Sequence, residues 1–453
     1  MARDLDVVVW GASGFTGQRV LQTLISAAGG LRIGAAGRSH TRVEAAVRAA
    51  ATAAAASSPA AAAPPIAAIE ILVADASHDA SLAAMASRAR LVLACVGPFR
   101  LHGLPVARAA VAAGCDYLDI CGEPAFIERV EHELFALAEE KGVFLASACG
   151  FDSIPADLGA LFTQAQFAPP ALASSVEAIV SVRPGPQGYK INFATYESAV
   201  LGVANAAELG TLRKAAARAR AERDAALPAP PARPAGPRAP KPSEGPTFDR
   251  DLGAYTLPFP GADASVVRRT QGEVARRAAA GDATAPPPVY FGARFSVGAS
   301  PVWAAAAVAC GAAFLALAKS GGAWGRRLLL DQPALFSCGL VSRSGPTEEQ
   351  MDGVSTRVHF VGKGYATADE AAAGGPPTKT VRTRVSLGDL GYKGTALILV
   401  GAALTLLEER GALEAATGRK GGVFTAGALF RRSSLRERLQ RSGGARFEVV
   451  AAA

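Results

Sequence analysis

Short runs of apolar residues alternate with longer amphipathic stretches through the first 150 residues. The apolar runs are DVVVW (6–10), LRIGAAG (31–37), IEILVAD (69–75), RLVLACVG (90–97), DYLDIC (116–121) and GVFLASA (142–148). Continuous apolar runs of this length are typical of strands covered on both faces, and their alternation with helical stretches indicates βαβ units. The pattern predicts an α/β fold with a Rossmann-type parallel sheet in this part of the chain.

From Val176 onwards the apolar residues follow a different period. The runs VEAIVSVRP (176–184), STRVHFVG (355–362) and TVRTRVSL (380–387) alternate apolar and polar positions. A period of two is expected for strands that expose one face to solvent. The sequence therefore predicts a second, α+β domain built on a mixed or antiparallel sheet, which is the natural place for a substrate site.

Three low-complexity stretches interrupt these patterns. Residues 49–68 are rich in alanine, and Pro64 and Pro65 must end any helix that runs into them. Residues 225–246 are rich in proline, and residues 366–377 contain ATADEAAAGGPP. We expect both of these later stretches to be disordered or extended loops.

Residues 295–318 carry no charge and lie between Arg294 and Lys319. The segment is long enough to span a bilayer as a helix, but ten of its residues are alanine, which weakens its apolar driving force. Three interpretations stay open: contact with a membrane or lipid-droplet surface, a buried core helix, or a true membrane span. Pro301 suits the first turn of a helix, and Arg326 and Arg327 would suit contact with anionic head groups.

A glycine-rich turn follows the first predicted strand, in the spacing GxxGxxG, and precedes a helical pattern. Glycine lets the backbone approach a pyrophosphate, and the free amides at the start of the helix supply hydrogen-bond donors. The alternative is a turn that only packs the helix close to the strand. The predicted dinucleotide site consists of Gly11, Ala12, Ser13, Gly14, Phe15, Thr16 and Gly17.

The end of the second predicted strand indicates which dinucleotide is bound. An acidic residue there would bind a ribose 2′-hydroxyl, but the chain has Arg38 and Ser39, which favour a 2′-phosphate and hence NADP. Asp75, after the third strand, either accepts a hydrogen bond from the adenine amino group or caps the next helix. Gly97 and Pro98 end the fourth strand, where a close backbone approach to the nicotinamide is expected.

The chain lacks the Tyr-x-x-x-Lys pair of short-chain dehydrogenases, since no tyrosine has a lysine four residues later. Two acidic clusters at predicted strand ends could instead relay a proton. Glu123 in DYLDICGEP and Asp152 in ACGFDSIPADLG are the candidate catalytic residues. The alternative for each is a structural role, such as capping a helix.

Composition narrows the function further. Half of the 453 residues are apolar, which suits a two-domain globular protein, and the net charge of +8 is too diffuse to indicate nucleic-acid binding. We interpret the six scattered cysteines as reduced thiols, and the five histidines show no zinc-ligand spacing. The opening MARDLD lacks the features of a secretory signal, so we expect a cytoplasmic protein that is not secreted.

Several motifs occur in one order along the chain: WGASGFTGQ (10–18), AGRS (36–39), CVGPF (95–99), DICGEP (119–124), CGFDSIPADLG (149–159), SVVRRTQ (265–271), SGPT (344–347) and GGVFTAGALF (421–430). Together they resemble the saccharopine dehydrogenase-like oxidoreductases, a group related to the mycobacterial trans-acting enoyl reductases. The resemblance implies a Rossmann domain over 1–160, an inserted mixed-sheet domain over 161–395, and a segment over 396–453 that returns to the Rossmann domain. It also implies that GGVFTAG (421–427) lies near the cofactor or the cleft between the domains.

The resemblance also bears on activity, because animal members are associated with lipid droplets and bacterial relatives reduce double bonds in lipid or polyketide precursors. We therefore expect an NADP-dependent oxidoreductase acting on a lipid-like or other apolar carbonyl or enoyl substrate, on the cytoplasmic face of a membrane or lipid droplet contacted through 295–318. The alternative is a membrane-associated scaffold or redox sensor that keeps a dinucleotide fold. One assembly compatible with these expectations is a homodimer.

Saccharopine reduction is a lesser alternative. A substrate with three carboxylates needs several arginines in the cleft, and the candidates are Arg183, Arg268 and Arg269. On a strand, Arg268 and Arg269 would point to opposite faces. In saccharopine reductases the sixth strand typically leads into Gly-x-Asp-Pro-Gly, whereas this chain reads GFDSIP. An arginine-rich cleft would favour an amino-acid substrate, and an apolar channel towards 295–318 would favour a lipid.

Overall fold

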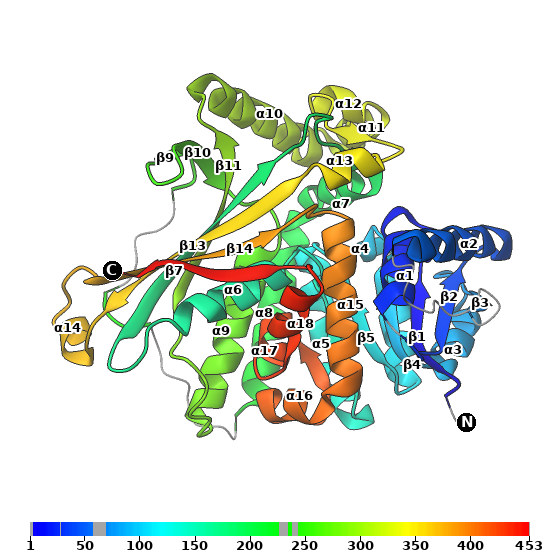
Figure 1. The fold of residues 1–453 in the computed structure, drawn as a ribbon, viewed down its shortest axis with the longest axis horizontal. Coiled ribbons are helices and arrows are strands. Elements are labelled where there is room, and N and C mark those ends of the chain that lie inside the picture. Colours follow the sequence, from blue (N-terminus) through cyan, green and yellow to red (C-terminus); the bar gives the residue numbers. More distant parts are fainter. Residues whose placement is uncertain (1–2, 28, 58–68, 226–233, 238–242, 453) are drawn as a thin grey trace.

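The computed structural model describes residues 3–27, 29–57, 69–225, 234–237 and 243–452. These residues form two large sheets with helices packed around them (Figure 1). The first sheet is entirely parallel and the second is mixed, which confirms the predicted fold class.

The first sheet has the strand order β15-β6-β5-β4-β1-β2-β3. The inner strand β1, between β4 and β2, is buried along its whole length, as the continuous apolar run predicted. The order reverses between β1 and β4, so a crevice lies at the carboxyl ends of these two strands. The strands are β1 (Leu5–Trp10), β2 (Ile33–Gly37), β3 (Glu70–Val73), β4 (Ala89–Ala94), β5 (Asp116–Asp119), β6 (Phe144–Ala146) and β15 (Gly422–Phe424).

Helices cover both faces of this sheet. On one face, α1 (Phe15–Ala27) packs between α2 (His40–Ser57) and α15 (Lys393–Glu408). On the other, α4 (Phe99–Ala112) packs between α3 (Asp79–Arg88) and α5 (Pro124–Lys141). The alanine-rich tract continues α2 as far as Ser57, and the rest of it lies outside the described residues.

The second sheet has the order β16-β14-β13-β7-β11-β10-β9. Only β7 and β11 pair in parallel, and the other neighbours are antiparallel. Two helices, α6 (Ile154–Gln164) and α9 (Asp263–Ala279), pack between this sheet and the rest of the molecule. The strands are β7 (Leu172–Arg183), β9 (Thr247–Asp249), β10 (Ala254–Pro258), β11 (Tyr290–Gly298), β13 (Ser355–Tyr365), β14 (Lys379–Leu387) and β16 (Arg446–Ala452).

The carboxyl-terminal segment is divided between the two sheets. After α15 and α16 (Arg410–Thr417), β15 joins the first sheet beside β6. The chain then forms α17 (Ala426–Phe430) and α18 (Leu435–Arg441), and β16 joins the second sheet beside β14. The last strand thus ties the two sheets together instead of staying with the Rossmann domain.

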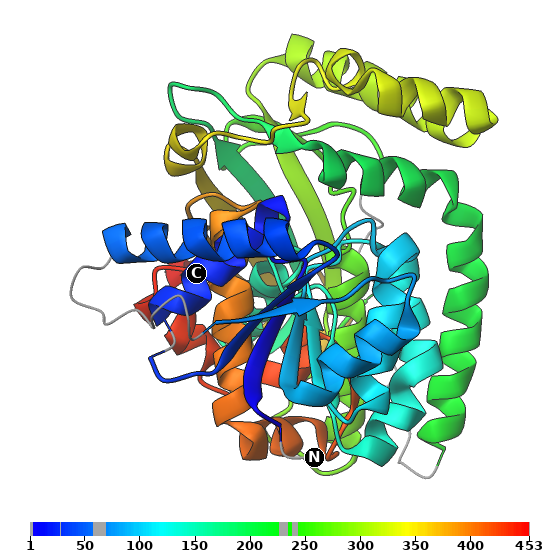
Figure 2. The same ribbon diagram turned by 90° about the vertical axis from the view of Figure 1, so that its right-hand side faces the viewer.

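A group of helices projects from the edge of the second sheet, at the top of both views (Figures 1 and 2). We call α7 (Phe193–Ala204), α10 (Pro301–Lys319), α11 (Gly322–Asp331) and α12 (Pro333–Phe336) the outer lobe. It has its own small core, in which Tyr196 and Val200 of α7 pack with Ala318 and Leu329. The long α8 (Ala206–Arg223) leads from this lobe back to α5. A short pair of strands, β8 (Ile191–Asn192) and β12 (Val341–Ser342), lies beside α7.

The two later low-complexity stretches, 225–246 and 366–377, differ in how much of them the structure describes. Much of the proline-rich stretch, residues 226–233 and 238–242, lies outside the described residues. The expectation of a loop over 366–377 is wrong in part, because it contains α14 (Ala368–Ala372). The Thr367 hydroxyl caps this helix by accepting from the Glu370 amide, and the Glu370 carboxylate accepts from the Ala366 amide and the Thr378 hydroxyl. The remaining short helix, α13 (Glu348–Asp352), begins with a complete capping box at Thr347.

Candidate dinucleotide and substrate site

The glycine turn joins β1 to α1 and has the shape of a phosphate-binding loop. Gly11 has a φ of +87°, which favours glycine. A Cβ on Gly17 would lie 2.0 Å from the Gly11 carbonyl oxygen, so Gly17 permits close packing of helix on strand. A Cβ on Gly14 would meet only that same oxygen, at 3.1 Å, and otherwise points into open space. The turn therefore leaves room at Gly14, at the helix amino terminus, for a pyrophosphate.

The remaining residues of the turn divide between core and surface. Ala12 is buried, whereas Ser13, Phe15 and Thr16 are half-buried. The Phe15 ring packs edge-on against Tyr392, with 4.8 Å between ring centroids. A Cβ on Gly345, in the SGPT motif, would lie 2.7 Å from the Phe15 ring. Loops from the second half of the chain thus hold the glycine turn in place.

The end of β2 lies next to this turn. A Cβ on Gly37 would be 3.7 Å from the Ser13 hydroxyl oxygen, and the exposed Arg38 and half-buried Ser39 follow directly. Their placement suits a phosphate on the adenosine ribose. Asp75 accepts hydrogen bonds from the Ser77 amide and hydroxyl through Oδ1, a local turn. The alternative that it caps the next helix does not hold, because α3 begins at Asp79, after His78, without a side-chain cap. The contact of Asp75 with adenine stays a prediction.

Glu123 lies at the other end of the crevice. It directly precedes α5, but its side chain caps the start of α4. Its carboxylate accepts hydrogen bonds from the Phe99 amide, at 2.7 Å, and the Arg100 amide, at 3.1 Å, at the start of α4. Burial raises the pKa of Glu123, and these two amides oppose the rise. The bonds fix the backbone that follows Gly97 and Pro98, so Glu123 positions the predicted nicotinamide site, in line with the structural alternative.

Replacing Glu123 with alanine should destabilise the protein by about 2 kcal/mol, because two buried amides lose their acceptor. Glu123→Gln keeps one acceptor oxygen and should lose less. Denaturant-induced unfolding followed by circular dichroism measures both changes. Equal stability of Glu123→Ala and the wild type would show that the capping bonds contribute nothing.

Three carboxyl groups gather where β6 leads into α6. Asp157 and Asp263 are buried, and Asp152 is half-buried with its Oδ1 atom out of contact with solvent. A Cβ on Gly122, after β5, would lie 2.7 Å from Asp152 Oδ2, so Asp152 faces the loop that carries Glu123. The capping alternative does not hold for Asp152, because α6 begins at Ile154 without a side-chain cap.

The three carboxyl groups share a single environment. Burial raises the pKa of Asp152 and of Asp157 to about 6. Burial and the nearby Asp152 charge raise the pKa of Asp263 well above its usual value. Among the described residues, nothing donates a hydrogen bond to the Oδ1 atom of any of the three. Buried carboxyl groups without such donors retain protons near neutral pH, so the cluster can store and release one.

Two hydroxyl groups connect this cluster to the carboxyl-terminal segment. Thr270 of α9 donates to Asp157 Oδ2 at 2.7 Å, and its oxygen lies 2.6 Å from the Thr425 oxygen. The Gly427 amide also donates to Asp157 Oδ2. Sequence reasoning missed Asp263, Thr270 and Thr425. The motifs SVVRRTQ and GGVFTAGALF, which contain two of them, were the available signal.

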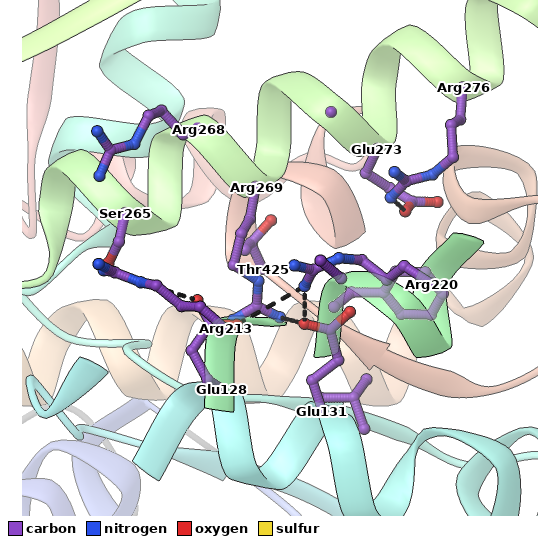
Figure 3. Close-up of a pocket in the computed structure, with 14 residues that line it drawn as sticks. Glu128, Glu131, Arg213, Arg220, Ser265, Arg268, Arg269, Glu273, Arg276 and Thr425 are labelled. Carbon is purple, nitrogen blue, oxygen red and sulfur yellow. Dashed lines mark hydrogen bonds and ion pairs between the residues drawn. The ribbon is translucent and has the colours of Figure 1, made fainter. Parts of the chain in front are cut away.

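A pocket of about 370 Å³ lies between α5, α8 and α9, with the end of β15 as one wall (Figure 3). Arg268 and Arg269 both line it, because they lie on helix α9, and the expectation for a strand does not apply. Arg183, at the end of β7, does not line it. The charged lining residues are Arg213, Arg220, Arg268, Arg269 and Arg276 with Glu128, Glu131 and Glu273.

A parallel sheet with a glycine turn at its switch point, buried acids at its carboxyl edge and a second domain across it define a dinucleotide-dependent oxidoreductase fold. The model of the saccharopine dehydrogenase NADP binding domain matches residues 7–145. A probable mitochondrial saccharopine dehydrogenase-like oxidoreductase of Arabidopsis thaliana is 35% identical, over 98% of this chain and 96% of that protein. This chain belongs to the saccharopine dehydrogenase-like oxidoreductase family.

A second relative and a solved structure are also similar to this chain. A lipid droplet localized protein of Caenorhabditis elegans is 32% identical, over 97% of this chain and 96% of that protein. The apo saccharopine dehydrogenase (L-Glu forming) of Saccharomyces cerevisiae has the same fold, with a TM-score of 0.54. It is 14% identical over 99% of this chain and all of that one, a level that defines the fold alone.

Proposed function

We propose that the chain is an NADP-dependent oxidoreductase that reduces a carbonyl group or an activated double bond of a lipid-like substrate at a membrane or lipid-droplet surface. The observation that carries the proposal is the outer lobe, whose apolar helix α10 is uncovered beside a dinucleotide-binding domain. NADPH supplies the hydride when it is bound. The protein must orient the substrate, exclude water and deliver a proton.

The residues of the crevice suit the cofactor. The open space at Gly14 accepts a pyrophosphate, and Arg38 with Ser39 suits the 2′-phosphate. Gly97 and Pro98 are fixed through the hydrogen bonds of Glu123 at the start of α4. A Cβ on Gly97 would lie 3.5 Å from the Ser198 hydroxyl of α7, so the outer lobe closes over this end of the crevice.

Asp152 is the proton donor in this proposal. Its raised pKa keeps a fraction protonated near neutral pH, and it is less buried than Asp157 and Asp263. Asp263 favours that protonated form, because two ionised carboxylates in one buried site repel each other. Asp152 would give its proton to the substrate atom that becomes negative on reduction, and solvent would return the proton.

The outer lobe supports a surface location. Residues of α10 expose apolar side chains on most sides, and only Ala304 and Ala318 of this helix are buried. The exposed fractions of Trp303, Trp324 and Leu335 are 70%, 69% and 71%, so α10, α11 and α12 all take part. The interpretation as a buried core helix is therefore wrong. Among the described residues, α10 alone is long and apolar enough to cross a membrane by length and composition.

Replacing Trp303 and Trp324 with serine should weaken binding to phosphatidylcholine vesicles containing phosphatidylserine. Each side chain is mostly exposed, and burying one in the interface is worth about 1.5 kcal/mol or more, or about tenfold in affinity. Co-sedimentation with vesicles measures the change. Phe248→Ser is the matched control, because Phe248 is 48% exposed on β9, outside the lobe. Unchanged vesicle binding by the double variant would contradict the surface role.

The reductase proposal is tested by NADPH consumption against a panel of lipid enones and ketones presented on vesicles. Consumption with any of them would exclude the scaffold or redox-sensor alternative. The imine of aminoadipate semialdehyde and glutamate belongs in the same panel, because the arginine-rich lining of the charged pocket is the feature expected for an amino-acid substrate. Turnover of the imine alone would replace the lipid-like substrate with an amino acid.

A further inference from the structure

The charged pocket contains more arginines than its own carboxylates can satisfy. Glu131 is shared by Arg220 and Arg269, each with an N···O distance of 2.6 Å. Glu273 pairs with Arg276. These three arginines fix α8 and α9 against α5 and use two of the three glutamates that line the pocket.

The other two arginines stand at the mouth of the pocket. Within the described part of the chain, Glu128 is the one carboxylate in ion-pair range of Arg213, with an N···O distance of 3.8 Å, which is too long for a hydrogen bond. Arg268 forms no hydrogen bond or ion pair with any described residue. The two side chains end on the same side of the pocket, near Ser265 (Figure 3). Partial burial and the charge of Arg213 lower the pKa of Arg268, and the carboxylate of Glu128 opposes them, so two like charges face a space that contains one carboxylate.

A third donor lies inside the pocket. Nη1 of Arg269 is buried and has no hydrogen-bond partner among the described residues. The Ser265 hydroxyl already donates to the Ala262 carbonyl at 2.8 Å, so the free donors of the pocket are cationic. Unpaired guanidinium groups around one cavity match a planar carboxylate or a phosphate, which accept several charge-assisted hydrogen bonds.

The position of the pocket separates it from the dinucleotide phosphates. Val423, Phe424 and Thr425 of the β15 end line it, and β15 lies four strands from β1 in the sheet. With about 4.8 Å between neighbouring strands, this places the pocket about 19 Å from the glycine turn along the sheet. Thr425 also contacts Thr270, which donates to Asp157, so one wall of the pocket adjoins the acid cluster.

We infer that the pocket lined by Arg213, Arg268 and Arg269 binds an anionic group of the substrate, a carboxylate or a phosphate. The anion neutralises the two facing arginines and anchors the substrate beside the acids at the carboxyl edge of the sheet. A substrate held in this way is amphiphilic, with its reducible group near Asp152. The assignment to the substrate rests on the proposed function, whereas binding of the anion itself does not.

The test uses the full-length protein saturated with NADPH, so that added anions cannot occupy the dinucleotide site. Inorganic phosphate and glutarate are titrated separately by calorimetry. We expect at least one to bind the wild type, and Arg268→Gln to weaken that binding by about tenfold or more. Arg218→Gln is the matched control, because Arg218 is an exposed arginine on α8 outside the pocket, and its binding should equal that of the wild type.

Stability provides a second readout. Without added anion, Arg268→Gln should unfold at the same temperature as the wild type or a higher one, because burial and repulsion from Arg213 disfavour the Arg268 charge more than Glu128 favours it. Should that variant fail to fold, Arg213→Gln carries the same test. Absence of binding of both anions to the wild type, or unchanged affinity in the variant, overturns the inference. Neither result depends on turnover, so failure of the reductase proposal is recognised separately, by the NADPH panel.

Discussion

Gly14→Val should abolish NADPH binding while the protein stays folded. The valine side chain would occupy the open space above the turn, and a Cβ there meets only the Gly11 carbonyl oxygen, at 3.1 Å. A pyrophosphate that cannot reach the helix amides loses charge-assisted hydrogen bonds worth about 3 kcal/mol, or about 100-fold in affinity. Quenching or enhancement of NADPH fluorescence on titration measures the loss.

Two further glycine variants separate binding from folding. Gly17→Val should destabilise the protein, because its side chain would meet backbone atoms of Gly11 and Ala12. Gly29→Ala should change neither property, since a Cβ there meets nothing within 4 Å. Normal NADPH affinity in folded Gly14→Val would mean that the turn is only a packing device.

Asp152→Asn should make the protein more stable at neutral pH and less active. The pKa of Asp152 rises from 3.8 to about 6 on folding, so at neutral pH the fold contains a buried carboxylate that is mostly ionised. Ionising this group in the fold costs up to about 3 kcal/mol, at about 1.4 kcal/mol per pKa unit. Asparagine has no charge to bury and avoids this cost. Loss of the proton donor should lower kcat by about 100-fold or more.

The stability difference between Asp152→Asn and the wild type should depend on pH. A carboxyl group with a raised folded pKa destabilises the fold progressively as the pH rises from about 4 to about 6, and the cost stays constant above that. Denaturant unfolding should therefore find the variant and the wild type equally stable near pH 4 and furthest apart above pH 6. Asp79→Asn, which changes an exposed carboxyl group on α3, should leave turnover unchanged. Greater stability with unchanged turnover would remove Asp152 from the reaction.

Local sequence patterns predicted most of the first sheet because β1, β2 and β4 are each buried within an apolar run of their own. The glycine turn was also predictable, since its glycine spacing lies within residues 11 to 17, although its contacts with Tyr392 and Gly345 were not. The acid cluster was not, because Asp157 receives its partners from Thr270 and Gly427, at sequence separations of 113 and 270 residues. No local period encodes such contacts, and Asp263 carries no motif of its own.

Composition also left the exposure of α10 open, since an uncharged, alanine-rich helix has the same sequence whether it is covered or not. The structure settles only that α10 is uncovered within the described chain. For Glu123, the position after β5 predicts either a catalytic or a structural role. Its carboxylate reaches across to the first amides of α4, a contact between two helices' ends that no local pattern encodes.

The pairing of β15 with β6 has a consequence for synthesis of the chain. Phe144 of β6 lies opposite Gly422, so one edge of the nucleotide-binding sheet stays open until almost the whole protein has left the ribosome. An unpaired parallel edge invites pairing with other chains, and closing a contact over so many residues is slow. The amino-terminal domain is therefore the first to be made and among the last to be finished, and the β6 edge of its sheet lacks its final partner during that interval.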